Sequence, residues 1–313
     1  MGPGCLKDVL EGIYDSYNRP EWISPDPLEC VLPFRDVLDR EIAALAASGL
    51  AYGRVRQILR SVGPVLGRMG PSPRAYLERA SRSCLERDFS CFRHRFTSGE
   101  DLIALFWGAR QLCMVHGGLE AAFLSHDRGG GDYRLALDGF LEELSAAGGG
   151  PVKNSLVCRP SDGSACKRHW LFLKWMVRSD EVDPGGWDSC DPGRLLVPLD
   201  THMHRIGRTL GFTGRKAADL KTALEVTRGF ARIVPGDPAR YDFCLTRFGI
   251  RDDLAFSSLL DKCRTASVDI HETQDQHPGD EKEGKRKGPI PRRARRLEDD
   301  PEKHGACHPG KLA

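Results

Sequence analysis

One lysine and one aspartate stand where this sequence best suits amine and carboxylate chemistry. Lys167 ends the segment GSACK (163–167), in which a glycine and small residues predict a tight turn before an apolar helix. A lysine in the first turn of a helix opposes the helix dipole, which costs about 0.3–1 kcal/mol. Lys167 is therefore either an amine nucleophile or an exposed lysine beside a capped turn.

The carboxylate is Asp200, in the segment PLDTHMHRIGRTLG (198–211). Asp200 takes the N-cap position of a predicted helix, and it is either only a cap or also a carboxylate at the mouth of a site. His202 and His204 do not complete a metal site with it, because residues two apart on a helix point in different directions. If Lys167 and Asp200 work together, we expect their charged groups about 4–7 Å apart in one cleft.

Basic side chains follow Asp200 closely, at Arg205, Arg208, Arg215, Lys216 and Lys221. The whole chain is nearly balanced, with 46 Lys and Arg against 44 Asp and Glu, but basic residues outnumber acidic ones between residues 151 and 267. Helix N-termini in this region offer backbone N–H groups to phosphate. The pattern favours an anionic partner, and an ordinary solvated basic face is the alternative.

Almost every segment that would position these groups predicts a helix. Apolar residues recur every three to four positions in 34–52, 54–70 and 132–150, and residues 170–177 are apolar nearly all round and should be buried. Capping residues predict further helix starts at Ser72-Pro73, Ser98 with Asp101, Asp200, Thr213 and Asp237-Pro238. A last helix is expected at about 252–263. No segment alternates with a period of two, so the predicted fold class is all-α.

Two segments depart from this pattern. Residues 179–199 form a long Gly/Pro-rich connection, and loops of that length in a compact domain are often functional. From residue 268 onward the chain is charged and nearly free of large apolar residues, which predicts a disordered tail over 268–313. Its RRARR run (292–296) is more simply explained as solvated charge than as a contact with nucleic acid.

The composition excludes several classes of protein. With 40% hydrophobic and 29% charged residues it is typical of a globular protein. The longest apolar stretch, 42–52, is too short to span a bilayer, and no signal peptide is visible, so we expect a cytoplasmic protein without membrane contact. The 11 cysteines include no Cys-x-x-Cys pair, so we expect reduced thiols, no metal and no cofactor.

Taken together, the two chemical segments resemble the helix-hairpin-helix (HhH-GPD) superfamily of DNA glycosylases and AP lyases. GSACK resembles the end of that family's phosphate-gripping hairpin, with Lys167 at the lysine position, and PLDTHMHRIGRTLG resembles its aspartate segment, with Asp200. The hairpin's second glycine is replaced by Ala165. Segments 17–29, 50–59 and 163–168 also resemble an uncharacterised bacterial protein family of unknown function.

The resemblance implies a two-lobed, all-α glycosylase-like domain over residues 1–267, with the hairpin and catalytic segment at about 151–250. It implies a monomer that acts on double-stranded DNA, cleaving a base–sugar bond with Lys167 as Schiff-base nucleophile and Asp200 as its assistant. The residues implied as DNA contacts are Gly163, Ser164, Ala165, Arg168, Arg205 and Arg208. Tyr52, His169 and Trp170 are candidate pocket residues, and the alternative for each is an ordinary core position.

Two other functions remain open from the sequence. A non-catalytic DNA- or RNA-binding module would keep the hairpin and lose the chemistry, and an interaction protein would use its tail to recruit partners. The presence of both Lys167 and Asp200 favours the enzyme, because a pure binding module needs neither of them.

Overall fold

The computed structural model describes residues 6–149, 155–251 and 253–263. The predicted tail at 268–313 lies outside these residues. The described part is mostly helical, with one two-stranded hairpin. The α-helices are α1 (Leu6–Tyr17), α2 (Val37–Gly49), α3 (Val55–Met69), α4 (Pro73–Arg79), α5 (Arg82–Phe89), α6 (Gly99–His116), α7 (Leu119–Ser125), α8 (Arg134–Ala147), α9 (Lys167–Val177), α10 (Thr201–Thr209), α11 (Leu220–Ile233) and α12 (Asp242–Ile250). Residues 256–263 are also helical.

Short 3₁₀ segments and the hairpin join these helices. The 3₁₀ segments are η1 (Pro20–Trp22), η2 (Pro27–Cys30), η3 (Ser155–Val157), η4 (Pro160–Asp162) and η5 (Pro192–Arg194). Strands β1 (Arg93–His94) and β2 (Thr97–Ser98) pair antiparallel between α5 and α6. The sequence did not predict this hairpin, because a strand of two residues is too short to show an alternating pattern.

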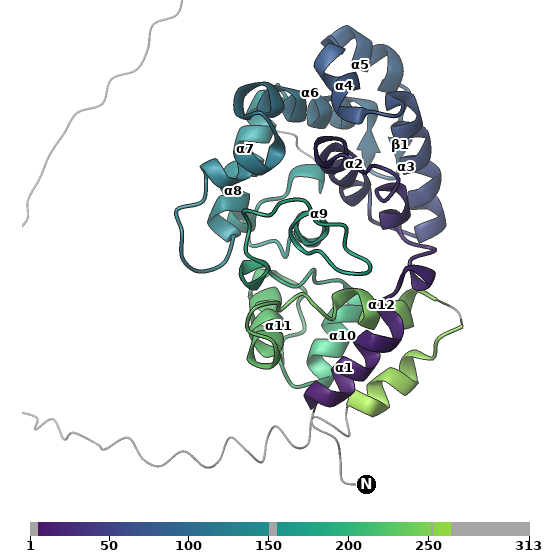
Figure 1. The fold of residues 1–313 in the computed structure, drawn as a ribbon, viewed down its shortest axis with the longest axis vertical. Coiled ribbons are helices and arrows are strands. Elements are labelled where there is room, and N and C mark those ends of the chain that lie inside the picture. The colour runs from purple at the N-terminus through teal and green to yellow at the C-terminus, as the bar shows by residue number, and fades with distance from the viewer. Residues whose placement is uncertain (1–5, 150–154, 252, 264–313) are drawn as a thin grey trace, which may run out of the picture. The chain divides into compact units, whose positions relative to one another are not determined.

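The larger helix contacts fall into two groups. One runs from α2 to α9, with α6 packed on α5 and α8, and α2 packed on α9. The other joins α1 to α12, α12 to α10, and α10 to α11. The N-terminal helix therefore lies beside the last helices of the described chain (Figure 1).

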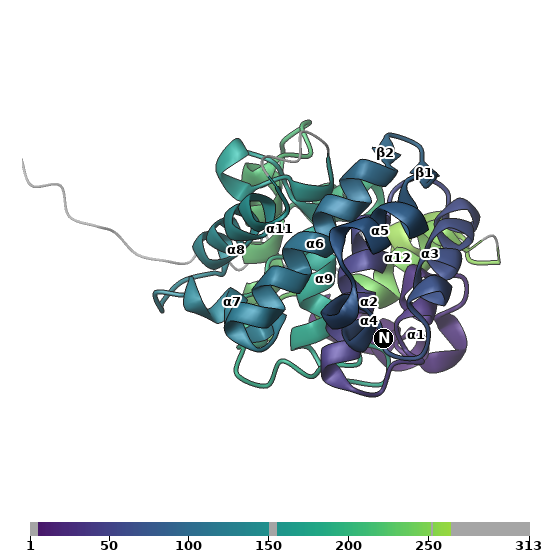
Figure 2. The same ribbon diagram turned by 90° about the horizontal axis from the view of Figure 1, so that it is seen from above.

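Helix α9 lies in the interior of this arrangement in both views (Figure 1, Figure 2). Its Trp170, Phe172 and Trp175 are at most 1% exposed, as the sequence predicted for residues 170–177. Burial of three large aromatic side chains on one short helix fixes its position, since each contributes about 1.5–3 kcal/mol or more of hydrophobic free energy. Lys167 begins this helix, so the candidate amine starts from a rigid element.

Helix starts that depend on a local cap were predicted well. The Ser72 hydroxyl accepts the Ala75 N–H, and Ser98 forms a capping box with Asp101. Two predicted starts were wrong. α11 begins at Leu220, after its cap Asp219, rather than at Thr213. α12 begins at Asp242 rather than at Asp237-Pro238, and the Asp237 carboxylate binds Arg178 instead of capping a helix.

The helix predicted at 34–52 covers only Val37–Gly49, so it is shorter than the segment over which the apolar pattern extends. It begins at Val37 because the Asp36 carboxylate caps it, accepting the N–H groups of Leu38 and Asp39. Phe34 precedes the helix, and the Leu38 side chain is 40% exposed, so only Ile42 and Leu45 of the predicted apolar face are fully buried.

Candidate active site

The turn before α9 presents Lys167 in a constrained geometry. Gly163 ends η4 in the left-handed region, with φ 76°, and its carbonyl accepts the N–H of Leu220 (3.0 Å). Cys166 is also left-handed, with φ 45°, which for a residue other than glycine costs about 1–2 kcal/mol. The chain therefore turns sharply twice within four residues before Lys167, and it is tied to the start of α11.

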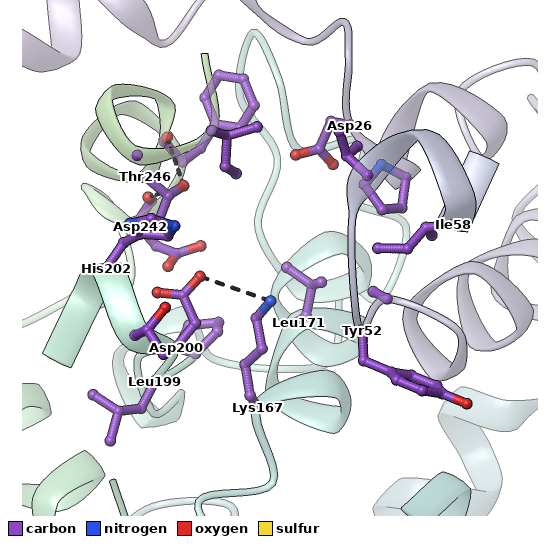
Figure 3. Close-up of a pocket in the computed structure, with 18 of the residues that line it drawn as sticks. Asp26, Tyr52, Ile58, Lys167, Leu171, Leu199, Asp200, His202, Asp242 and Thr246 are labelled. Carbon is purple, nitrogen blue, oxygen red and sulfur yellow. Dashed lines mark hydrogen bonds and ion pairs between the residues drawn. The ribbon is translucent and has the colours of Figure 1, made fainter. Parts of the chain in front are cut away.

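Asp200 caps α10 and also faces Lys167. It caps α10, because its Oδ1 atom accepts the N–H of Met203 (2.8 Å). Its Oδ2 atom lies 3.8 Å from Nζ of Lys167, slightly closer than the 4–7 Å expected. The two side chains point toward one another in Figure 3, and they are 34% and 18% exposed.

This ion pair lies at a cavity of about 660 Å³. The cavity is lined from both helix groups: η2, the residues before α3, α3 itself and α9 on one side, and α10 and α12 on the other. Its size lies within the 300–1,000 Å³ that is usual for small-molecule pockets. The cavity is therefore large enough to hold a small molecule.

A second lysine lies deeper in the same cavity, about two turns further along the same face of α9. Lys174 is 1% exposed, and its Nζ atom lies 2.9 Å from Asp183 Oδ1 and 3.6 Å from Asp242 Oδ2. Asp242 begins α12 and also lines the cavity. The contacts of Lys174 with Asp183 and Asp242 were not predicted from the sequence, although a lysine inside an otherwise apolar helix already required a buried partner.

Burial controls the protonation of the deeper carboxylate. The pKa of Asp242 is raised to about 6, mainly by desolvation; the carboxylates of Asp200 and Asp183 add to this rise, whereas Lys174 and Lys167 oppose it. The cavity therefore holds one carboxyl group that takes up a proton near pH 6, beside an ammonium group that stays charged because burial is offset by its carboxylate partners.

The outer face of α10 carries the predicted phosphate contacts. Arg205 and Arg208 are exposed and line a shallow groove with His204 and Thr209. The guanidinium group of Arg205 lies 4.7 Å above the ring of Phe256. Gly163 is exposed, Ser164 is half-buried and Ala165 is buried, so only the first part of the turn at 163–167 reaches the surface.

Arg168 does not fit the surface role that was predicted for it. It is 8% exposed, its Nη1 atom donates to the carbonyl of Gly49 (2.7 Å), and its guanidinium group lies 5.0 Å from the Tyr52 ring. Because the side chain points inward and its charge is used within the fold, a contact between Arg168 and a DNA phosphate is not supported.

The three candidate pocket residues have different positions. Tyr52 lines the cavity, but its ring is directed away from the Lys167 amine (Figure 3), and its hydroxyl binds the His94 carbonyl (2.6 Å). His169 and Trp170 are buried and do not line the cavity. They are core residues, which was the alternative that the sequence analysis had stated.

The side chains of His202 and His204 on α10 point in different directions, as expected for residues two apart on a helix. His202 lines the cavity and packs against Phe256, whereas the His204 ring bonds the Arg215 carbonyl (2.9 Å). Within the described residues, no group of three His, Cys, Asp or Glu side chains is placed to hold a metal ion.

None of the described helices has both the length and the apolar character needed to cross a membrane.

Comparison with known proteins gives the chain a family. Residues 26–251, which include Lys167, Asp200, Lys174 and Asp242, match DUF2400, a family described as proteins of unknown function. No curated protein and no solved structure matched the chain. The expected likeness to an uncharacterised family is thus confirmed, and the chain belongs to the DUF2400 family.

Proposed function

We propose that this protein is a DNA glycosylase with AP lyase activity, which cleaves the bond between a base and its sugar. The observation that carries the proposal is the Lys167–Asp200 pair, 3.8 Å apart at the mouth of a cavity between two helix groups. The resemblance of residues 163–167 and 198–211 to helix-hairpin-helix glycosylases supports the same reaction and the two-lobed fold of that superfamily.

Lys167 acts as the nucleophile in this proposal. Its amine attacks C1′ of the sugar, the C1′–N bond breaks, and the base leaves with the bonding electrons. Asp200 accepts a proton from the attacking amine and stabilises the positive charge that develops on the sugar. Ring opening then gives a Schiff base, which permits strand cleavage by β-elimination.

The cavity is where the target base would be bound. A base inside a duplex is out of reach of any side chain, so the nucleotide must first rotate out of the stack. The cavity has room for one base, and the exposed Arg205 and Arg208 beside it supply positive charge for the flanking phosphates. The turn at Gly163 and Ser164 offers backbone contacts of the same kind.

A non-catalytic nucleic-acid-binding module is the alternative. Such a module would use the basic face of α10 and the hairpin but would need neither an amine nor a carboxylate at an open cavity. The position of Lys167, partly exposed and facing Asp200, therefore favours the enzyme.

Borohydride trapping tests this proposal. Reduction of the Schiff base should join the protein covalently to duplex DNA that carries an abasic site, and Lys167→Gln should abolish the product while leaving DNA affinity nearly unchanged. Asp200→Asn should slow base release about 10²–10³-fold without loss of the helix cap, because asparagine keeps the capping oxygen. Lys7→Gln, at an exposed lysine on α1, is the matched control. Trapping that persists in Lys167→Gln would overturn the proposal.

A further inference from the structure

Two cysteines lie together beneath the turn that carries Lys167. Cys158 precedes η4, and Cys166 is the N-cap residue of α9. The Cys166 thiol donates to the carbonyl oxygen of Cys158 (3.2 Å), so its side chain reaches back across the turn. The Cys166 thiol, the His169 ring and the Ser164 hydroxyl also lower the pKa of the Cys158 thiol.

The surroundings of these sulfurs make them unequal. Hydrogen bonds from Cys166 and His169 hold the pKa of the Cys158 thiol well below its usual range, whereas contact with Cys158 and burial raise the pKa of Cys166. The buried guanidinium group of Arg168 adds positive charge near Cys158. Cys158 is thus the more easily deprotonated of the two, and a thiolate beside a protonated thiol forms a disulfide readily.

We propose that Cys158 and Cys166 are a peroxide-sensitive thiol pair whose disulfide displaces Lys167 from Asp200. The Cys158 thiolate attacks one oxygen of hydrogen peroxide, the O–O bond breaks, and the departing hydroxide takes up a proton to form water. The Cys158 sulfur is oxidised to a sulfenic acid and the peroxide is reduced. Cys166 then attacks this sulfur, an S–S bond forms, and the hydroxyl group leaves with the Cys166 proton as a second water.

The disulfide acts on Lys167 through the backbone. Cys166 is held in a left-handed conformation by its present contacts, and the N–H of Cys166 donates to the Ser164 hydroxyl (3.2 Å). An S–S bond replaces the contact between the Cys166 thiol and the Cys158 carbonyl, so residue 166 must rotate. Lys167 follows it directly and begins α9, and its amine therefore shifts relative to Asp200. This consequence rests on the proposed function of Lys167, whereas formation of the disulfide does not.

Peptide mapping of the full chain tests the thiol pair without any DNA. Both cysteines lie in one tryptic peptide, residues 154–167, because Arg159 is followed by proline. Treatment with a small excess of hydrogen peroxide should remove two hydrogen atoms from this peptide and block its alkylation. Cleavage before Asp162 should then leave two fragments joined until a reductant is added. Cys91 is the control, since it is exposed.

The outcomes are distinguishable. The pair is supported if Cys158 and Cys166 join before Cys91 reacts, and if Cys158→Ser and Cys166→Ser each abolish the joined fragments. It is overturned if Cys91 is oxidised while residues 154–167 still take up two alkylating groups. In the borohydride assay, oxidation should lower trapping up to about 100-fold, and a dithiol should restore it. If the reduced protein traps no DNA, the proposed function fails while the mapping still decides the disulfide.

Discussion

Helix α9 carries the lysines of two lysine–aspartate pairs, and the pairs differ in spacing and in exposure to solvent. Lys167 and Asp200 lie 3.8 Å apart with 34% and 18% of their side chains exposed. Lys174 lies 2.9 Å from Asp183, with 1% and 0% exposed. The first pair is loosely spaced and partly exposed, whereas the second is almost completely shielded from solvent. The two lysines thus have the same type of partner and differ in exposure and in the distance to that partner.

The buried pair belongs to a larger ionic network. Arg178 binds Asp183, and its other atoms bind Asp180 (2.9 Å) and Asp237 (2.8 Å). These contacts join α9 to the loop at 179–199 and to the residues before α12. The long connection at 179–199 is therefore held by ion pairs at its start, close to the end of α9.

The largest expected effect contrasts the same substitution at the two lysines. Lys174→Met leaves Asp183 and Asp242 buried with less compensating charge, so it should lower the free energy of unfolding by about 3–5 kcal/mol. Lys167→Met breaks a partly exposed pair and should cost less than about 1 kcal/mol. Urea denaturation of both variants measures the difference. Equal losses at the two positions would remove the distinction between the pairs.

A smaller effect depends on pH. Burial raises the pKa of Asp242 to about 6, above the value of 3.8 for an unperturbed aspartate. The folded state then binds more protons than the unfolded state between these values, so this group's contribution to stability falls as pH rises toward 6. Asp242→Asn removes the titration, and its stability relative to the parent should rise by up to about 3 kcal/mol between pH 4 and pH 8.

The check is a pair of denaturation series, one for each protein, across that pH range. The quantity to compare is the change with pH, because the loss of contacts with Lys174 adds a constant offset to the variant. A difference that stays flat from pH 4 to pH 8 would show that Asp242 has an ordinary titration in the folded protein.

The smallest effect concerns the exposed face of α10. Arg205→Ala and Arg208→Ala should each weaken duplex binding by about 1 kcal/mol and reduce the slope of log affinity against log salt by about 1, since each removes one phosphate contact. Arg215→Ala serves as the comparison. It should give a smaller change in affinity, because the Arg215 side chain is already bound to Asp219 (2.6 Å). A slope unaffected by all three substitutions would favour the interaction-protein alternative.

Local signals account for most of what the sequence predicted correctly. Ser72, Ser98 and Asp200 each cap a helix by accepting the N–H of the residue three positions later, so a short window contains the whole interaction. The convergence of Lys167 and Asp200 was expected only from the resemblance of their two segments. Their spacing in the chain does not by itself bring them together.

Long-range contacts account for what was missed. The cap-like Asp237 is used by Arg178, which lies in a different part of the chain, so its local pattern predicted a helix start that does not occur. Lys174 finds Asp242 on α12, and no short segment of sequence contains both. Arg168 turns inward because the Gly49 carbonyl at the end of α2 accepts its N–H, a partner that only the packing of α2 on α9 supplies.

The most direct test of the central claim is the identity of the residue that becomes attached to DNA. After borohydride trapping with abasic duplex DNA, digestion and mass spectrometry of the adduct should locate the reduced linkage on Lys167, the open member of the two lysines on α9. An adduct on Lys174, on the N-terminal amine or spread over surface lysines would contradict the assignment of the Lys167–Asp200 pair as the reactive site.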